Sequence, residues 1–413
     1  MSSLEWQRVD TLARQTKRRV FAGTRRSAKI AVHRARNAAL QGVVLFKKAG
    51  RRLWNLRKPV VRWRYRTHRL QEQFATYRDE WRIEREIERA VAGTGPIVIG
   101  PWLSEVGYEV LYWVPFVRWV KAAFRIDPDR LWVVSRGGVG SWYADVTTNY
   151  VDIFDEISPL EFSARNIDRS EGEGTNKQFG MSALDRMLMD RVRSRIGTAD
   201  VQVLHPSLMY RLFKQFWSGH RPLDFLDSHT RNVRIAPPAF DLAALALPKE
   251  YVAVKFYAAR SLPDTPDNRA MLRTLVESIA ERWPVVLLDT GLNLDDHADY
   301  TFQGGSRIVS AKPHLDARHN LGIQTQIIAG ARAFVGTCGS LAWLAPMMGV
   351  DTTAVFTDAR FLHSHLHAAR RLYHVLDGGR FSPLDLSALD PLGLSLASRQ
   401  VATLPAGPAP PPS

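Results

Sequence analysis

Apolar runs and helical periods alternate along the chain from residue 97 onward. A short apolar run at residues 97–99 leads into a loop at 100–107, and residues 108–124 then have the apolar spacing of a helix. A second apolar run covers residues 131–135. This order of strand, helix and strand is typical of a βαβ unit, so we expect a parallel sheet in this half of the chain.

The same rhythm returns after residue 250. Residues 251–257 (YVAVKFY) form an apolar strand of the buried type, and a helix is expected at about 266–282. A strand at 285–288 and a helix at about 320–330 follow. The chain therefore predicts an α/β fold with two Rossmann-like parallel-sheet domains.

A strand, a turn of small residues and a helix follow one another near residue 335. The apolar run ends at Val335, residues 341–345 are helix-like, and residues 352–356 form another strand-like run. Such a turn leaves backbone N–H groups unpaired at a helix start, where the dipole favours an anion. The predicted anion-binding turn comprises Gly336, Thr337, Cys338, Gly339 and Ser340. A tight turn without a ligand explains the same pattern, because the full phosphate-loop motif is not present.

Composition and punctuation divide the chain into four segments. Residues 158–235 are irregular apart from two helices near 181–195 and 206–218, which indicates an insertion or a wall of an acceptor cleft. Pro237-Pro238 marks a linker. The four predicted segments are a basic, mainly helical arm (1–93), a first Rossmann-like domain (94–236), a second one (248–395) and a Pro-rich tail without a core (396–413).

Positive charge is concentrated in the arm. The 413 residues contain 56 Lys and Arg against 41 Asp and Glu, a net charge of +15. Residues 1–70 hold 20 of these Lys and Arg against two acids, a net of +18, so residues 71–413 sum to −3. Apolar spacing over residues 70–81 predicts that the arm ends in an amphipathic helix reaching about residue 91. Cations interleaved with aromatic residues suit an anionic membrane surface or nucleic acid, and a solvated tail explains them as well.

The cysteine count and the apolar stretches indicate the cellular compartment. A single cysteine, Cys338, excludes an internal disulfide framework, which fits a reducing environment. No secretory signal is recognisable, and the longest apolar stretch, residues 327–350, is broken by glycines and a proline. We therefore expect a cytoplasmic protein.

In open α/β sheets, ligands bind beyond the carboxyl ends of the strands. This rule selects Ser104, Glu105, Gly107 and Glu109 after the first strand, and Lys255 and Arg260 in the second half. Cations in one half and carboxylates in the other would suit a phosphorylated donor and an acceptor hydroxyl that loses its proton to a carboxylate. Asn320 and Gln324, one helical turn apart, could face a nucleotide base, although a capped or solvated helix face explains them too.

We do not expect a metal site. The loop sequence Asp295-Asp296-His297 is typical of a solvated turn. Of His363, His365 and His367, only the first and third would share a face of a helix, and no cysteine supports a zinc site there.

The two-unit layout resembles the GT-B glycosyltransferases, in which an acceptor-side Rossmann-like domain precedes a donor-side one. Residues 334–350 (FVGTCGSLAWLAPMMGV) are similar to the phosphate-proximal turn and helix of heptosyltransferase-like and fucosyltransferase-like members. The loop at residues 100–109 (GPWLSEVGYE) resembles their acceptor-side loop. The His-x-Arg-Arg pattern of fucosyltransferases is absent after residues 251–257, where Lys255 and Arg260 stand instead, so the donor sugar is left open.

The resemblance implies transfer of a sugar from a nucleotide-sugar donor to a hydroxyl acceptor, such as a cell-envelope glycan or glycolipid, without a metal or cofactor. Glu105 would be the base, with Glu109 as second choice, and Ser104 and Gly107 would belong to the acceptor-side loop. Lys255, Arg260 and the amides after Thr337 would hold the diphosphate. Such an acceptor favours an anionic membrane as the partner of residues 1–70, with nucleic acid less favoured. The resemblance thus implies a protein held peripherally on the inner face of a membrane. Two alternatives stay open: a nucleic-acid-binding protein on a non-catalytic α/β scaffold, and a pyruvyl or phosphoryl transferase of the same architecture.

Overall fold

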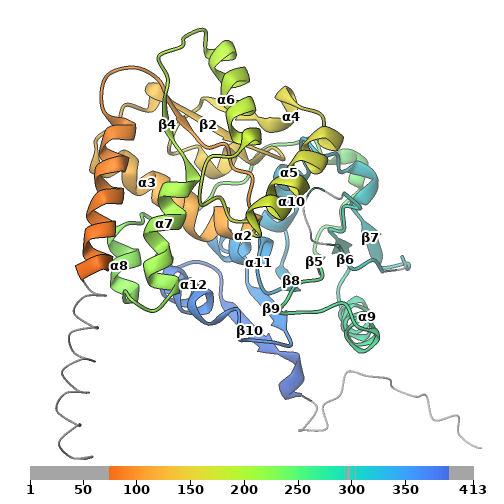
Figure 1. Ribbon diagram of the computed structural model, residues 1–413. Helices are drawn as coiled ribbons and strands as arrows, with labels where there is room; N and C mark the ends of the chain where they lie inside the picture. The colour runs from red at the N-terminus through yellow and green to blue at the C-terminus, as the bar shows by residue number, and fades with distance from the viewer. Residues whose placement is uncertain (1–73, 293, 295–297, 303, 390–413) are drawn as a thin grey trace, which may run out of the picture. The chain divides into compact units, whose positions relative to one another are not determined.

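The computed structural model of the chain describes residues 74–292, 294, 298–302 and 304–389 (Figure 1). The described residues from Thr76 onward form one compact unit. No helix within the described ranges is long and apolar enough to cross a membrane. The expected basic arm up to residue 73 and the expected Pro-rich tail lie outside the described residues.

The first half contains a parallel sheet of four strands in the order β3-β2-β1-β4. Its strands are β1 (Ile97–Ile99), β2 (Leu131–Ser135), β3 (Tyr150–Asp152) and β4 (Gln202–Leu204). All three residues of β1 are buried, as expected for a parallel strand covered on both faces. The expected strands at 97–99 and 131–135 are therefore present and neighbours.

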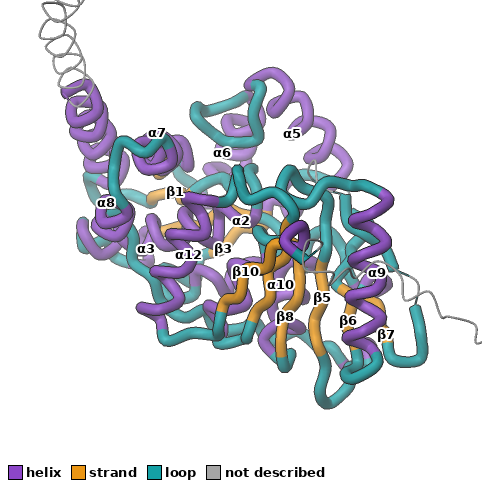
Figure 2. The backbone as a smooth tube through the Cα atoms, turned by 90° about the horizontal axis from the view of Figure 1, so that it is seen from below, coloured by secondary structure: helices purple, strands orange, loops and turns teal. Residues whose placement is uncertain are grey.

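The second half contains a parallel sheet of six strands in the order β10-β9-β8-β5-β6-β7. Its strands are β5 (Val252–Lys255), β6 (Val285–Leu287), β7 (Ile308–Ser310), β8 (Ala333–Thr337), β9 (Thr352–Phe356) and β10 (Phe381–Asp385). Figure 2 shows strands of this sheet side by side, with α9 (Pro266–Ala280) packed against β6. The α/β fold class with two parallel sheets is thus present in the structure.

Helices connect the strands of both sheets. A helical stretch from Val106 to Ala123 follows β1 and contains a π-helical turn at Glu109–Trp113. The bounds of the helices are α2 (Val106–Tyr108), α3 (Val114–Ala123), α4 (Ile153–Glu156), α5 (Pro159–Glu173), α6 (Ala183–Ile196), α7 (Pro206–Trp217), α8 (Leu223–Ser228), α10 (Asn320–Ala329), α11 (Leu341–Leu344) and α12 (His363–Leu376). The helices expected near 181–195, 206–218, 266–282 and 320–330 correspond to α6, α7, α9 and α10.

The stretch at 158–235 is more ordered than the sequence indicated. It contributes β4, which pairs with β1, so this part of the chain returns to the first sheet instead of forming only an insertion. It also contains α5, which begins with Ser158 as N-cap and Pro159 in its first turn. The polar composition of residues 159–173 masked this helix, because few of its side chains are buried.

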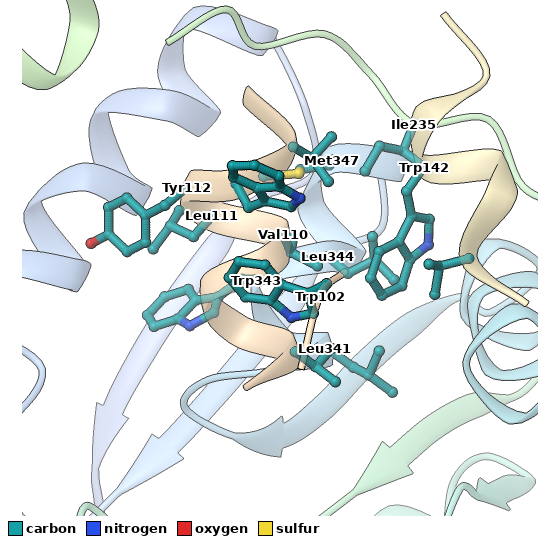
Figure 3. Close-up of a cluster of buried hydrophobic side chains, with 14 of the residues drawn as sticks. Trp102, Val110, Leu111, Tyr112, Trp142, Ile235, Leu341, Trp343, Leu344 and Met347 are labelled. Carbon is teal, nitrogen blue, oxygen red and sulfur yellow. The ribbon is translucent and has the colours of Figure 1, made fainter. Parts of the chain in front are cut away.

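Both halves contribute to one hydrophobic core (Figure 3). Trp102, from the loop after β1, is fully buried and stacks on Trp113 with 5.8 Å between ring centroids. Trp142 follows β2 and donates a hydrogen bond of 3.1 Å to Thr325 Oγ1 on α10. Trp343 of α11 lies in the same cluster. Buried indoles therefore tie the loops of the first half to the helices of the second.

From Thr76 onward, the helix at residues 74–91 belongs to the folded body. Its residues Ile83, Ile87 and Val91 are buried in the same hydrophobic core as β1, at the spacing of one helical face. The predicted helix to about residue 91 is therefore present, but its second half is not part of an arm. The limit of the arm at residue 93 has to be moved to before residue 76, because the apolar face of this helix is covered by the core.

The packing of this helix predicts the effect of truncating Ile87, which has no exposed surface. We expect Ile87→Ala to lower the free energy of unfolding by about 2–5 kcal/mol, because it removes buried methyl groups and leaves a cavity. Arg89→Ala, at an exposed position on the same helix, should change it by less than about 0.5 kcal/mol. Denaturant unfolding of both variants measures the difference, and equal effects would show that the helix does not pack as described.

Candidate functional site

A cavity of about 940 Å³ lies where loops from the two sheets meet. Its lining includes segments that follow the carboxyl ends of β1 (Glu105), β2 (Arg136), β5 (Tyr257), β6 (Thr290), β8 (Cys338) and β9 (Phe361). Because all strands of each sheet are parallel, their carboxyl ends share one edge. The cavity is therefore at the edge where the sequence rule placed ligand binding.

The cavity lies at the switch points of both sheets. In the first sheet the chain passes outward from β1 to β3 and then returns to the other side of β1 as β4. In the second sheet it passes from β5 to β7 and returns beside β5 as β8. Strand order reverses at these points, and the diverging loops leave a crevice for a ligand. The loops after β1, β5 and β8 all line the cavity.

The loop after β1 and the turn after β8 touch each other. A Cβ atom on Gly107 would lie only 2.9 Å from the backbone N of Ser340, and 3.3 Å from the Cδ1 atom of Trp343. No side chain fits between these segments, which explains why a glycine is needed at position 107. Gly107 and Ser340 both line the cavity, so the two switch points share one wall.

The turn after β8 differs in part from its expected structure. Thr337 belongs to β8 and is buried, and its hydroxyl accepts from the N–H of Tyr257 (2.9 Å) and donates to the Tyr257 carbonyl (3.0 Å). The Cys338 N–H donates to the carbonyl of Val355. Thr337 therefore cannot offer its hydroxyl to a ligand, and this part of the prediction is corrected.

Gly339 and Ser340 remain the anion-ready part of the turn. Both line the cavity, and their amides make no hydrogen bond within the described residues. Gly339 has φ +146°, and a Cβ there would collide with the Tyr257 hydroxyl. The helix that follows, α11, has only four residues, so the expected contribution of a helix dipole is small. Any attraction for an anion comes from these two amides and from nearby cations.

Cys338 lines the cavity as an inert thiol. Its side chain is 2% exposed, and burial raises the pKa of the thiol to about 12. A thiol in that state is a poor nucleophile, because the thiolate is the reactive form.

Lys255 lines the cavity but is not a free cation. Its ammonium donates to the Leu288 carbonyl (3.0 Å) and lies 3.1 Å from Asp299 Oδ1. Asp299 Oδ2 also accepts from the backbone N–H and hydroxyl of Thr290. The charge of Lys255 is therefore compensated by a largely buried carboxylate. The sequence could not show this partner, which is 44 residues away.

The two carboxylates proposed as base lie in different surroundings. Glu105 is half-buried and lines the cavity at the start of α2. Glu109 is fully buried, does not line the cavity, and accepts hydrogen bonds from Ser135 Oγ (2.6 Å) and Tyr143 Oη (2.7 Å). The structure thus retains Glu105 as a candidate base and removes Glu109, which cannot reach a ligand.

Ser104 also faces the interior. It is 2% exposed, its hydroxyl donates to the carbonyl of Asn176 (2.6 Å), and it accepts from Tyr210 Oη (2.7 Å). The expected ligand contact from Ser104 is therefore corrected to a structural contact between two loops.

The remaining predicted residues line the cavity. Arg260, after β5, is exposed, and its guanidinium lies 5.6 Å from the ring centroid of Phe361. Asn320 and Gln324 are buried in the first turns of α10. Gln324 Nε2 donates to the Asn320 carbonyl (3.0 Å), which fixes the amide orientation, and its Oε1 has no partner within the described residues. This unpaired acceptor is itself buried.

Sequence reasoning missed a cluster of aromatic and basic side chains in the cavity lining. Its members are Tyr108, Tyr112, Lys177, Trp217 and His365, all of which line the cavity. His365 Nδ1 lies 2.6 Å from Tyr112 Oη, and its Nε2 lies 3.2 Å from Tyr108 Oη. Burial, with a smaller effect from the charge of Lys177, lowers the pKa of His365 to about 4, so the ring is neutral near pH 7. The spacing of His365 with the buried Ala369 and Leu372 could have placed it on the inner face of a helix.

The two histidines on either side of His365 were considered above as ligands of a metal site. His363 and His367 are exposed on α12 with ring centroids 4.6 Å apart. Among the residues that the structure describes, no group of three or more His, Cys, Asp or Glu side chains is placed to hold a metal ion. The loop residues 295–297 lie outside the described residues.

Comparisons with known proteins give structural likenesses only. Neither protein-family models nor curated proteins match this chain. Similar solved structures include a family 9 glycosyl transferase from Veillonella parvula (TM-score 0.40, 10% identity, covering 74% of this chain and 90% of that chain). The E. coli ADP-heptose LPS heptosyltransferase II matches with TM-score 0.35 and 11% identity over 64% of this chain and 85% of its own. A UDP-GlcNAc 2-epimerase from Methanocaldococcus jannaschii matches with TM-score 0.30 and 10% identity over 74% and 93%. At these TM-scores the likenesses carry no argument about function.

The surroundings of Glu109 predict a pH dependence of stability. Burial raises the pKa of Glu109 to about 7, against the lowering effects of Ser135, Tyr143 and the charge of Arg136. The folded protein therefore binds a proton more tightly than the unfolded chain, and stability is lost as pH rises from about 4.5 through about 7. The loss should be on the order of 3 kcal/mol, at 1.36 kcal/mol per unit of pKa.

Glu109→Gln should remove this loss, because the amide keeps an acceptor for Ser135 and Tyr143 and does not ionise. Denaturant unfolding at several pH values between 4.5 and 8, for the wild type and this variant, measures it. A slope that is the same in both proteins would exclude Glu109 as its source.

Proposed function

We propose that the chain is a glycosyltransferase that uses a nucleotide-sugar donor. The observation that carries the proposal is that one cavity joins the switch points of both sheets, with Glu105 on the wall from the first half and Arg260, Gly339 and Ser340 on the wall from the second. This layout supports a reaction between two substrates, one held by each half. An anionic donor suits the cation and amides, and a hydroxyl acceptor suits the carboxylate.

In the proposed reaction, Glu105 accepts the proton of the acceptor hydroxyl as its oxygen bonds to the anomeric carbon of the donor. The bond from that carbon to the diphosphate breaks, and the diphosphate leaves with the bonding electrons. Arg260 and the amides of Gly339 and Ser340 stabilise the charge that develops on the leaving group. Lys255 has a positioning role: its ion pair with Asp299 holds the loop after β6 against β5.

The wall formed by Asn320 and Gln324 suits the uncharged part of the donor. Both side chains are buried beside the cavity, and Gln324 Oε1 is a buried acceptor without a partner within the described residues. A base amine or a sugar hydroxyl is the kind of group that would pair with it. We propose no metal or cofactor for the reaction.

We further propose that residues 1–70 hold the enzyme at an anionic membrane surface, near a glycan or glycolipid acceptor. The net charge of +18 in this segment supports this, because each basic residue close to anionic lipid contributes about 1 kcal/mol. The body is close to neutral and adds little to such an attraction. Nucleic acid remains the less favoured partner of the same charge.

The donor proposal is tested first with the wild type. In thermal unfolding with UDP-, GDP-, ADP- and CDP-sugars, at least one donor should raise the melting temperature, because a ligand that binds only the folded state stabilises it.

With that donor, Glu105→Gln should lower kcat for transfer by roughly 10²–10⁴-fold and leave the donor Kd nearly unchanged. Glu281→Gln is the matched control, because Glu281 is exposed and does not line the cavity. If no donor stabilises the wild type, the chain would fit a non-catalytic scaffold. If Glu105→Gln keeps full activity, Glu105 is excluded as the base.

The membrane proposal is tested by vesicle sedimentation of the full chain and of a chain that begins at residue 71. The full chain should sediment with phosphatidylserine vesicles at 0.1 M salt and much less with neutral vesicles, because the attraction is between charges. The shortened chain should lose this binding. Equal sedimentation with both vesicle types would contradict the proposal, and salt-dependent binding of RNA or DNA without lipid binding would favour nucleic acid.

A further inference from the structure

The segment around Lys177 is fixed to the loop after β1. The carbonyl of Asn176 accepts hydrogen bonds from Ser104 Oγ (2.6 Å) and Arg169 Nη2 (3.1 Å). On the other side, Gln178 has no exposed surface, and its Oε1 accepts from the N–H of Leu103 (2.9 Å). Both neighbours of Lys177 are thus held by residues that precede Glu105, so the position of Lys177 is set relative to the candidate base.

Gln178 is itself held by a buried network. Its Nε2 donates to the carbonyl of Pro101 (3.0 Å) and to Asp185 Oδ1 (2.9 Å) on α6. Asp185 Oδ1 also lies 3.0 Å from His205 Nε2, and the Ser207 N–H donates to His205 Nδ1 (3.1 Å). Because Nδ1 is an acceptor, Nε2 carries the proton. A solvated loop does not need this many buried hydrogen bonds around one lysine.

The ammonium group of Lys177 lies in the cavity over two aromatic faces. It is 4.8 Å from the ring centroid of Tyr108 and 5.4 Å from that of Trp217, whose rings are 5.3 Å apart edge to face. Within the described residues, its Nζ makes no hydrogen bond and no ion pair. The rings stabilise the cation electrostatically, and its three N–H donors are available to a ligand in the cavity.

The charges that face Lys177 favour a multiply charged anion. Burial lowers the pKa of Lys177, Glu105 opposes that effect, and the charge of Arg260 lowers the pKa further. Two cations, one from each half of the body, therefore act on each other across the cavity. Glu105 can balance only one of them, and Lys255 is already compensated by Asp299. A group with about two negative charges would relieve the repulsion.

We propose that Lys177, together with Arg260, binds the diphosphate of the donor, in the place that the sequence assigned to Lys255. The inference rests on the proposed function and adds to it a residue from the acceptor-side half. A diphosphate held in this way is bound by both halves of the body, so its binding also brings Glu105 to its working distance from the donor.

The test is isothermal titration of the full chain with ADP, CDP, GDP and UDP and with the matching nucleosides. Lys177→Met keeps the apolar stem over the rings and removes the charge, so it should weaken the tightest nucleoside diphosphate by roughly 10–100-fold. Nucleoside affinity should not change. Lys177→Arg should restore most of the diphosphate affinity, since it restores a cation.

Lys214→Met is the matched control. Lys214 also lies over an aromatic ring, 5.8 Å from the centroid of Phe179, but it does not line the cavity. The Lys214→Met variant should bind the diphosphate as the wild type does. The melting temperature of each variant shows whether that variant is folded.

The outcomes separate the inference from the proposed function. A wild type that binds no nucleoside diphosphate would overturn both. A wild type that binds, with Lys177→Met binding equally well, would overturn the role of Lys177 and leave the proposed function standing. Equal losses of nucleoside and diphosphate affinity in Lys177→Met would show a structural effect and also overturn it. Loss of diphosphate affinity in Lys177→Met alone, with recovery in Lys177→Arg, supports it.

Discussion

The close contact between Gly107 and the backbone of Ser340 is the constraint on which the site depends. It joins the loop after β1 to the turn after β8, and so it joins the switch points of the two sheets. A side chain at position 107 would force these segments apart or cover the Ser340 amide. The shared cavity, the position of Glu105 and the accessibility of the turn all follow from this one approach of two backbones.

How far the sequence predicts the fold depends on where a strand lies in its sheet. The strands predicted from apolar runs, β1, β2, β5, β6, β8 and β9, are those with a neighbour on both sides. The strands missed, β3, β4, β7 and β10, lie at the sheet edges. An inner parallel strand is covered on both faces and reads as a continuous apolar run, whereas an edge strand is short or polar and tolerates a proline such as Pro383 in β10.

The site was predictable where it depends on the chain's local order. The carboxyl-end rule located Glu105 and Arg260, and the strand-turn-helix pattern located Gly339 and Ser340. All four residues line the cavity. It failed where a partner from elsewhere decides the outcome. Asp299 compensates Lys255, buried hydroxyls hold Glu109, and Lys177 reaches the cavity only because its neighbours are bound to the loop after β1. Such contacts between distant residues leave no periodic signal in a single sequence.

The proposed reaction requires that an anionic leaving group binds where the two switch points meet. A crystal structure of the full chain with the nucleoside diphosphate that it binds most tightly would show whether it does. We expect the diphosphate oxygens within hydrogen-bonding distance of the Gly339 and Ser340 amides, on the side of the cavity that faces Glu105. A diphosphate bound outside this cavity, or a cavity closed by side chains around Gly107, would contradict it.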